Sequence, residues 1–216
     1  MDYYPIFVDL KGRPVLVVGG GSVAEGKVQG LLAAHAEITV VAPQLTDTLR
    51  ELVDSKRIQH TAREYQPGDL DDRSICFVAT DDGAINARVA ADCRARGVWV
   101  NAADDPANCD FILPAVVRSG KVVVAASTGG ASPAMARRLR EELTAFVAEG
   151  YAPLTDLLAD VRKEVRAASF RVEPETWQRA IDAKLRTLVA QGRIAEAKDR
   201  LRQALGLEPA PARREG

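Results

Sequence analysis

Short apolar segments and segments of helical period alternate along the first half of the chain. Apolar runs, mostly of β-branched residues, predict strands at 15–18, 37–41, 58–61, 74–79 and 98–101. Between them, apolar residues recur at the spacing of one helix face over 23–34, 45–54 and 84–96. Because parallel strands need a crossover between them, this alternation predicts an α/β fold with a doubly wound parallel sheet.

A different pattern begins after residue 110. The apolar runs Phe111–Arg118 and Lys121–Ser127 flank Ser119-Gly120 and predict an antiparallel hairpin. Ser132 is the expected N-cap, and Pro133 the first residue, of a helix over 134–149. Helical period then predicts helices over 152–168, 174–191 and 194–205, with a frayed polar tail at 209–216. We therefore expect a sheet domain at 1–113, a hairpin region at 114–150 and a C-terminal helical domain at 151–216.

The predicted hairpin lies outside the parallel sheet, and its strands are almost entirely apolar. Apolar strands of this kind need cover from water. A symmetric dimer would provide that cover, and so would helices of the same chain. We interpret residues 114–150 as a dimerisation region and keep the second source of cover as the alternative.

Three glycines stand between the first strand and the first helix, in the segment Gly19-Gly20-Gly21-Ser22-Val23-Ala24. The first glycine allows a tight turn, and the third lets a pyrophosphate approach the backbone. Ala24 allows close packing of helix on strand, and the N–H groups at the helix start attract phosphate. The alternative is a glycine-rich turn without a ligand, but the strand before it and the helix after it favour a Rossmann-like dinucleotide site. The predicted cofactor-binding residues here are Gly19, Gly20, Gly21, Ser22, Val23 and Ala24.

The residues after the second strand bear on the choice of cofactor. Dinucleotide domains often carry an acidic residue there, which binds the ribose 2′-hydroxyl of NAD. This chain has Ala42-Pro43-Gln44, with neither an acidic residue nor an arginine that would hold a 2′-phosphate. Ala42 and Pro43 are candidate cofactor contacts, and the residues alone leave NAD and NADP open.

Polar residues follow two more strands at the expected ligand-binding edge of the sheet. Thr80 and Asp81 follow the strand at 74–79 and are candidate cofactor contacts, although Asp81 and Asp82 are also suited to cap the next helix. The segment Asn101–Phe111 follows the last strand and is rich in carboxylates and amides. Carboxylates at this position could move a proton or hold a hard cation, whereas Asp and Asn could equally serve only as turn residues.

Composition excludes several other classes of protein. The 216 residues carry 29 basic and 30 acidic side chains, so the net charge of −1 gives no general attraction to nucleic acid or to a membrane surface. The apolar runs are far shorter than a membrane helix, and the N-terminus lacks the features of a secretory signal. Cys76, Cys93 and Cys109 form no C-x-x-C pair, so we expect neither a disulfide framework nor a cysteine zinc site, and a cytoplasmic location.

Taken together, the motifs resemble the precorrin-2 dehydrogenase family, which includes the N-terminal half of sirohaem synthase and bifunctional dehydrogenase/ferrochelatases. The motifs that carry the resemblance run in order from the N-terminus to about Arg140. They are Pro5-Ile6-Phe7, Val17–Ala24 with Lys27, Ala79–Asp82, Asn101–Pro106, Phe111–Ala115 and Ser127–Pro133. The helical region from Tyr151 matches in type and length only.

The resemblance implies an enzyme that uses NAD to convert precorrin-2 to sirohydrochlorin in sirohaem biosynthesis, working as a homodimer. It implies Asp104 as the catalytic residue and no resident metal. Because the tetrapyrrole substrate carries many carboxylates, its pocket should contain fixed cations. The candidate substrate-binding residues are Asn101, Asp105, Thr128, Gly129, Arg137 and Arg138. Thr128 departs from several relatives, which have serine there.

Two alternatives remain at this stage. Some members of the family also insert Fe²⁺ to give sirohaem, and Asp104 could serve both activities. A non-catalytic module that senses NAD would explain the glycine loop, but it would leave the motifs at Asn101–Phe111 and Ser127–Pro133 without a purpose.

Overall fold

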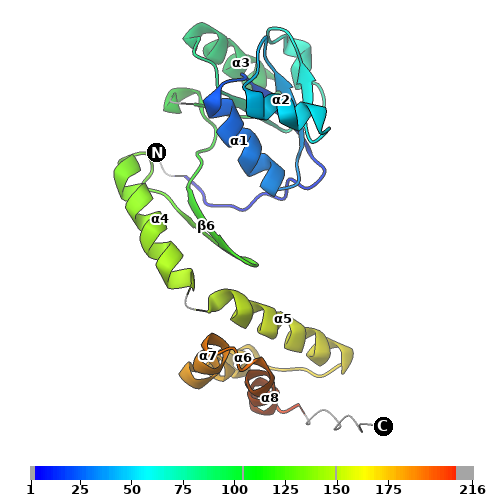
Figure 1. The fold of residues 1–216 in the computed structure, drawn as a ribbon, viewed down its shortest axis with the longest axis vertical. Coiled ribbons are helices and arrows are strands. Elements are labelled where there is room, and N and C mark those ends of the chain that lie inside the picture. Colours follow the sequence, from blue (N-terminus) through cyan, green and yellow to red (C-terminus); the bar gives the residue numbers. More distant parts are fainter. Residues whose placement is uncertain (1–2, 104, 149, 208–216) are drawn as a thin grey trace. The chain divides into compact units, whose positions relative to one another are not determined.

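The computed structural model describes residues 3–103, 105–148 and 150–207 (Figure 1). The chain divides into two compact units, Met1–Leu113 and Pro114–Gly216, and each is described by itself. This boundary agrees with the predicted end of the sheet domain at residue 113.

The first unit is built on a five-stranded sheet with the order β3-β2-β1-β4-β5, in which every pair is parallel. The strands are β1 (Pro14–Val18), β2 (Glu37–Val41), β3 (Gln59–Thr61), β4 (Ile75–Val78) and β5 (Trp99–Ala102). Val18 lies opposite Val41 on one side and Val78 on the other, so β1, β2 and β4 end at the same edge. The glycine loop and the polar segments after β4 and β5 therefore begin at that edge.

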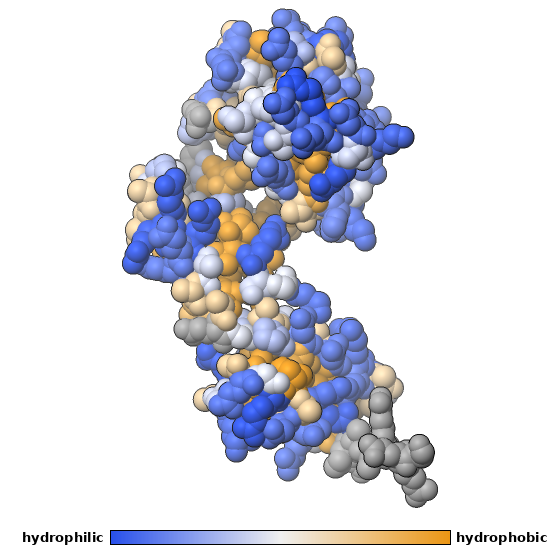
Figure 2. All heavy atoms as spheres, viewed as in Figure 1, coloured by the Kyte–Doolittle hydropathy of each residue, from blue (hydrophilic) through white to orange (hydrophobic). Residues whose placement is uncertain are grey.

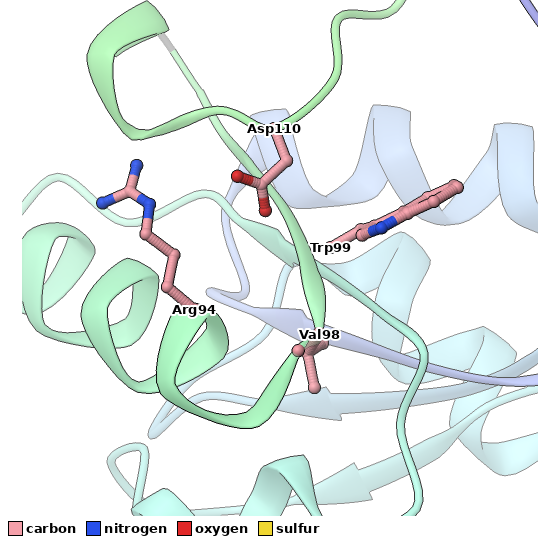
Figure 3. Close-up of a pocket in the computed structure, with 5 residues that line it drawn as sticks. Arg94, Val98, Trp99 and Asp110 are labelled. Carbon is pink, nitrogen blue, oxygen red and sulfur yellow. The ribbon is translucent and has the colours of Figure 1, made fainter.

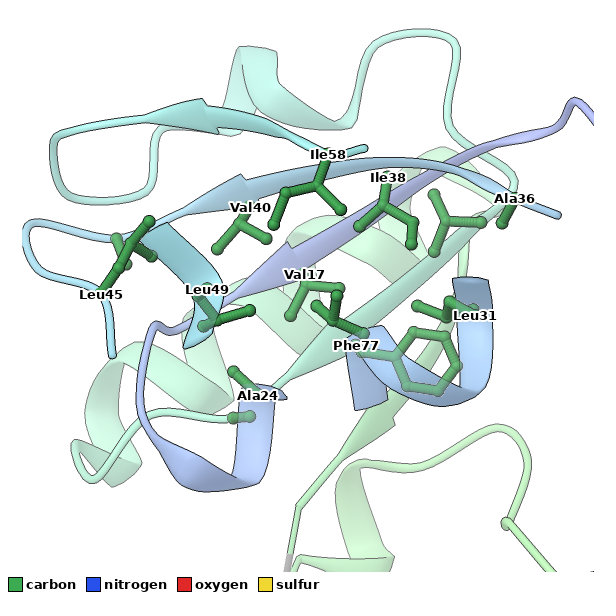
Figure 4. Packing of buried hydrophobic residues seen from close by; sticks show 14 of the residues in the cluster. Val17, Ala24, Leu31, Ala36, Ile38, Val40, Leu45, Leu49, Ile58 and Phe77 are labelled. Carbon is green, nitrogen blue, oxygen red and sulfur yellow. The ribbon is translucent and has the colours of Figure 1, made fainter. Parts of the chain in front are cut away.

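Helices cover both faces of the sheet, as the alternating pattern predicts. The helices are α1 (Ser22–Ala33), α2 (Asp47–Asp54) and α3 (Gly83–Arg96). Figure 4 shows the core under α1 and α2, where Ala24, Leu31 and Leu49 pack on Val17 and Val40. Side chains of β1 and β4 that point the other way pack on α3, as Leu16 and Cys76 do on Cys93. The fold is the predicted doubly wound, Rossmann-like sheet.

The second unit contains the predicted hairpin and an all-helical region. Strands β6 (Ala115–Ser119) and β7 (Val122–Ala126) are antiparallel, and α4 (Pro133–Ala148) packs against both. Only Val117 of the hairpin is buried, and an apolar patch lies where β6 runs (Figure 2). Helix α4 therefore supplies part of the cover that the hairpin needs. The first strand starts four residues later than predicted, after Pro114, which has no N–H for a ladder.

The helix predicted over 174–191 is wrong as one element, because the structure has two helices there. They are α6 (Pro174–Ala180) and α7 (Ala183–Ala190), and they pack with α5 (Tyr151–Ala167) and α8 (Ile194–Ala204) around a shared core. The break falls at Ile181 and Asp182. The Asp182 carboxylate accepts the Leu185 N–H at 2.8 Å as the N-cap of α7 and also pairs with Arg200 of α8. A local cap outweighs the continuous helical period at this point.

Replacing Asp182 by alanine is expected to destabilise the helical region by about 1 kcal/mol, the usual value of a lost cap. The pKa of Asp182 lies below its usual value, first because Arg200 donates to the carboxylate and then because Leu185 N–H does. The cap therefore stabilises the folded state fully above the unfolded-state pKa of the carboxyl, and this stability is lost as the pH falls through the lower folded-state pKa. Urea unfolding of the full chain measures the loss. Asp160→Ala, which removes an exposed ion pair with Lys163, is the control and should change little; equal losses in the two variants would contradict the cap.

Among residues 3–103, 105–148 and 150–207, none of the helices combines the length and apolar character needed to cross a lipid bilayer.

Candidate active site

Gly19 occupies a place in the glycine loop that only glycine can take. Its φ is +118°, and a Cβ built on it would lie 2.1 Å from the Ala79 carbonyl oxygen. Its N–H donates to the Val41 carbonyl at 3.0 Å. The first glycine thus turns the chain between the ends of β2 and β4, as the motif predicts.

Gly20 is held against the loop after β2. A Cβ on Gly20 would lie 2.0 Å from the Gln44 carbonyl oxygen, and the Gly20 carbonyl accepts the Thr46 N–H at 3.0 Å. The Thr46 hydroxyl accepts the Leu49 N–H, capping α2, and donates to Glu25 on α1 at 2.8 Å. Ala42 in this loop is buried, and Pro43 is exposed. The segment that would face the adenosine end of a cofactor is therefore fixed to the glycine loop itself.

Gly21 and the start of α1 have the open space that a pyrophosphate requires. No atom lies within 4 Å of a Cβ built on Gly21, which is the N-cap of α1 and offers no side chain to its N–H groups. Ser22 and Val23 are exposed, whereas Ala24 is fully buried against the sheet. Unpaired N–H groups at a helix start, beside an open backbone, form a site for a phosphate anion. The space at Gly21 and the burial of Ala24 fit a dinucleotide, and the cofactor contacts of these residues stay predictions.

Replacing Gly21 by alanine is expected to leave the fold intact and to weaken NAD binding about 10-fold, since a methyl group would occupy the space for the pyrophosphate. Titration calorimetry with NAD measures the affinity. Gly26→Ala is the matched control, because Gly26 lies on α1 and a Cβ there also meets no atom within 4 Å. An unchanged affinity in the Gly21 variant would contradict the placement of the pyrophosphate.

The segment after β4 is arranged mainly by its own hydrogen bonds. Asp82 accepts the N–H groups of Ala84 and Ile85 at 2.8 and 3.2 Å, which confirms its role as the N-cap of α3. The Thr80 hydroxyl donates to Asn86 Oδ1 at 2.6 Å. Asp81 is exposed at the same edge of the sheet. The proposed cofactor contacts of Thr80 and Asp81 stay predictions.

The segment after β5 is a loop closed at its base by paired contacts. Asn101 Nδ2 donates to the Phe111 carbonyl at 2.9 Å, and the Asp110 N–H donates to the Val100 carbonyl at 2.8 Å. The Asp110 carboxylate in turn accepts the Val100 N–H at 2.9 Å. These contacts continue the edge of β5 and return the chain to it ten residues later. The described residues of this loop are Ala103 and 105–109.

The Cys109 thiol contacts the backbone on the other side of the loop, at Ala102 and Asp105. Its Sγ lies 3.2 Å from the Ala102 nitrogen, which donates to it, and 3.1 Å from the Ala102 carbonyl oxygen. It also lies 3.3 Å from the Asp105 carbonyl oxygen. Burial is the main cause that raises the pKa of Cys109, so the thiol stays protonated and can donate as well as accept. Cys109 is therefore a structural thiol of this loop.

The predicted catalytic residue, Asp104, lies outside the described residues. Its neighbour Asp105 accepts from Asn108 Nδ2 at 2.7 Å. Asn101 is 6% exposed, and its amide contacts Lys27, Cys109 and Phe111. This favours a role for Asn101 in positioning the loop rather than in touching the substrate.

The other predicted substrate contacts belong to the second unit, so their approach to the sheet edge stays a prediction. Thr128 bonds to the backbone of Ser132 in both directions, at 3.2 and 3.3 Å, and Gly129 has a φ of +62°. The Ser132 hydroxyl accepts the Met135 N–H, which confirms the predicted cap of α4. Arg137 and Arg138 are exposed on α4, and Arg138 pairs with Glu142.

An open pocket of about 380 Å³ lies elsewhere on the first unit (Figure 3). Arg94, Gly97, Val98, Trp99 and Asp110 line it. Because Trp99 begins β5, the pocket is at the opposite edge of the sheet from the glycine loop. It contains none of the predicted site residues. Within the described residues, no group of three or more His, Cys, Asp or Glu side chains is placed to hold a metal ion.

One contact at the site links residues that sequence reasoning did not connect. Lys27 on α1 donates from Nζ to Asn101 Oδ1 on β5 at 3.2 Å. Lys27 belongs to the quoted glycine motif, but no sequence pattern indicates a partner 74 residues away. The positions of Cys109 and Asp110 were likewise not predicted, because their polar side chains look like ordinary turn residues.

Comparison with known proteins identifies both parts of the chain. Residues 6–115 match a family model described as putative NAD(P)-binding, and residues 124–145 match one described as sirohaem biosynthesis protein central. Sirohaem synthases from Nitrosomonas europaea and Methylococcus capsulatus are 39% and 40% identical over 95% and 94% of this chain. The chain spans 44% of the length of each of these two relatives.

A solved structure of SirC, a precorrin-2 dehydrogenase, has the same fold over nearly the whole chain. The two are 31% identical, with a TM-score of 0.75, and the match covers 90% of this chain and 98% of that one. Both the parallel sheet and the segments that follow it are thus shared with a protein of similar size. The chain accordingly belongs to the precorrin-2 dehydrogenase family, which it shares with the N-terminal half of sirohaem synthase.

Proposed function

We propose that this protein removes two hydrogens from precorrin-2, with NAD as the acceptor, and releases sirohydrochlorin. The observation that carries the proposal is the match to SirC, which extends over 98% of that dehydrogenase. The open glycine loop supports it, since the reaction needs a bound dinucleotide at that edge of the sheet. One hydrogen leaves as a hydride and the other as a proton, so the enzyme needs a hydride acceptor and a base.

The cofactor would be held by the glycine loop and by the residues at the ends of β2 and β4. When bound, NAD supplies the hydride acceptor. Gly21 admits the pyrophosphate, and the N–H groups at the start of α1 neutralise part of its charge. Ala42 and Pro43 would face the adenosine ribose, with Thr80 and Asp81 beside the nicotinamide end. The residues after β2 leave NAD and NADP open, so NAD is proposed from the family match and not from this segment.

The proposed substrate contacts belong to two segments of the chain, the one after β5 and the turn before α4. Asp104 would take the proton, as a carboxylate at the carboxyl end of the sheet can do within reach of both reactants. Arg137 and Arg138 would bind substrate carboxylates, because guanidinium groups match them geometrically. Asp105, Thr128 and Gly129 are further proposed substrate contacts.

We also propose that the protein works as a homodimer in the cytoplasm. The support for the dimer is the hairpin of β6 and β7, most of which stays partly exposed although α4 packs against it. A second copy packed on the hairpin would bury those apolar residues. Sedimentation of the purified protein distinguishes a dimer from a monomer.

The proposed activity is tested by mixing the purified chain with NAD⁺ and precorrin-2 without dioxygen and following NADH absorbance. We expect NADH to form at a rate proportional to enzyme, and more slowly with NADP⁺. NAD binding without turnover would instead favour the sensing module, and would contradict a dehydrogenase.

A further inference from the structure

A lysine at the base of the glycine loop contacts the strand that leads into the Asp104 loop. Lys27 lies one turn after Ala24 on α1, on a partly buried face of the helix. Its ammonium donates to Asn101 Oδ1 at 3.2 Å. Helix α1 begins at the proposed pyrophosphate site, and Asn101 lies in β5, one residue before its end at Ala102. The contact therefore spans the two halves of the proposed active site, within one compact unit.

Asn101 also contacts the residue at which the loop after β5 ends, Phe111. Its amide is buried, and buried amides need partners for both the oxygen and the nitrogen. The oxygen accepts from Lys27, while Nδ2 donates to the Phe111 carbonyl at 2.9 Å and lies 3.6 Å from Cys109 Sγ. Cys109 then holds the Ala102 and Asp105 backbones. One side chain thus connects α1 with both ends of the loop.

The orientation of the Asn101 amide depends on the positive charge of Lys27. A bond from an ionised donor is stronger than one between neutral groups, and it fixes the Asn101 amide with its oxygen toward α1. If the ammonium is removed, a buried carbonyl oxygen loses that donor. The amide is then free to turn, and a turned amide presents its oxygen, which cannot donate, to the Phe111 carbonyl.

We propose that Lys27 is a positioning residue: through Asn101 it ties the cofactor-binding helix to the loop that carries Asp104. The expected effect on kcat rests on the proposed function. The contact between Lys27 and Asn101 does not depend on any substrate. Bound cofactor and the catalytic carboxylate would be held at a fixed separation, which hydride and proton removal from one ring system requires.

Amide hydrogen exchange on the full chain tests the tie without substrate. In Lys27→Met, the peptide covering residues 101–111 should exchange at least about 10-fold faster than in the wild type, because its base contacts open more often. Peptides from β4 and α3 should keep their rates. Lys27→Arg retains the charged donor and should restore protection. Lys11→Met removes the same charge from the exposed turn before β1, and should behave as the wild type.

The kinetic measurement separates positioning from general stability. Lys27→Met should lower kcat for precorrin-2 oxidation about 10- to 100-fold, leave the dissociation constant of NAD within about 3-fold, and recover with arginine. Unchanged exchange at 101–111, faster exchange throughout the first unit, or wild-type kcat in Lys27→Met would each overturn the proposal. If the wild type itself fails to oxidise precorrin-2, the proposed function fails, and the exchange comparison alone decides whether Lys27 holds the loop.

Discussion

Replacing Asp104 by asparagine is expected to lower the rate of sirohydrochlorin formation by about 10³-fold, the usual scale for loss of a general base. Asparagine has nearly the same shape but cannot take a proton at neutral pH. The loss should fall on kcat, while NAD binding at the glycine loop stays at the wild-type level. Stopped-time assays of sirohydrochlorin, together with calorimetry for NAD, measure both quantities.

Asp105→Asn is the matched control, since the two carboxylates are adjacent and the change is the same. Asp105 accepts a hydrogen bond from Asn108 within the loop, and its loss should lower the rate about 10-fold or less. A wild-type rate in the Asp104 variant would show that the base has been assigned to the wrong residue. A large loss in the Asp105 variant alone would move the assignment to Asp105.

Gly19→Ala is expected to destabilise the first unit by about 3 kcal/mol or more. The backbone at Gly19 has a φ of +118°, where an L residue is strained, and the new methyl group would lie 2.1 Å from the Ala79 carbonyl oxygen. Ala79 directly follows β4, so its backbone cannot shift without disturbing the end of that strand. The Gly19 N–H bond to Val41 and the Ala79 N–H bond to Val18 would both be disturbed. Urea unfolding followed by circular dichroism gives the loss.

Gly21→Ala is the control for Gly19→Ala, because it adds the same methyl group to the same loop. The two glycines are two residues apart, yet a methyl group on Gly21 meets nothing within 4 Å. We expect the first variant to lose stability and the second to lose only affinity for NAD. Equal stability of the two variants would contradict the conformation of the glycine loop.

The parts of the fold that follow from local pattern were predictable from the sequence. The runs of β-branched residues predict the parallel sheet, and Ser132 and Pro133 predict the start of α4. Gly19 was also predictable, because a strand that turns sharply into a helix needs a residue without a side chain. Each of these features depends on neighbours in sequence.

The parts that depend on distant partners were not predictable. The helical period continues through Asp182, and only the contact with Arg200 and the local cap show why the helix divides there. From the sequence, Cys109 is only a thiol in a predicted turn. Its structural role depends on four contacts of Sγ, with Asn101, Ala102 (two) and Asp105. Lys27 and Asn101 are 74 residues apart, and no periodicity connects a helix residue with a strand residue at that separation.

The proposed NAD-dependent dehydrogenation is tested by the ratio of NADH to sirohydrochlorin formed when the purified chain acts on precorrin-2 and NAD⁺ without dioxygen. One hydride is transferred for each molecule oxidised, so we expect a ratio of one, and no product when NAD⁺ is omitted. Sirohydrochlorin that forms without NADH, or no sirohydrochlorin although NAD is bound, would contradict it.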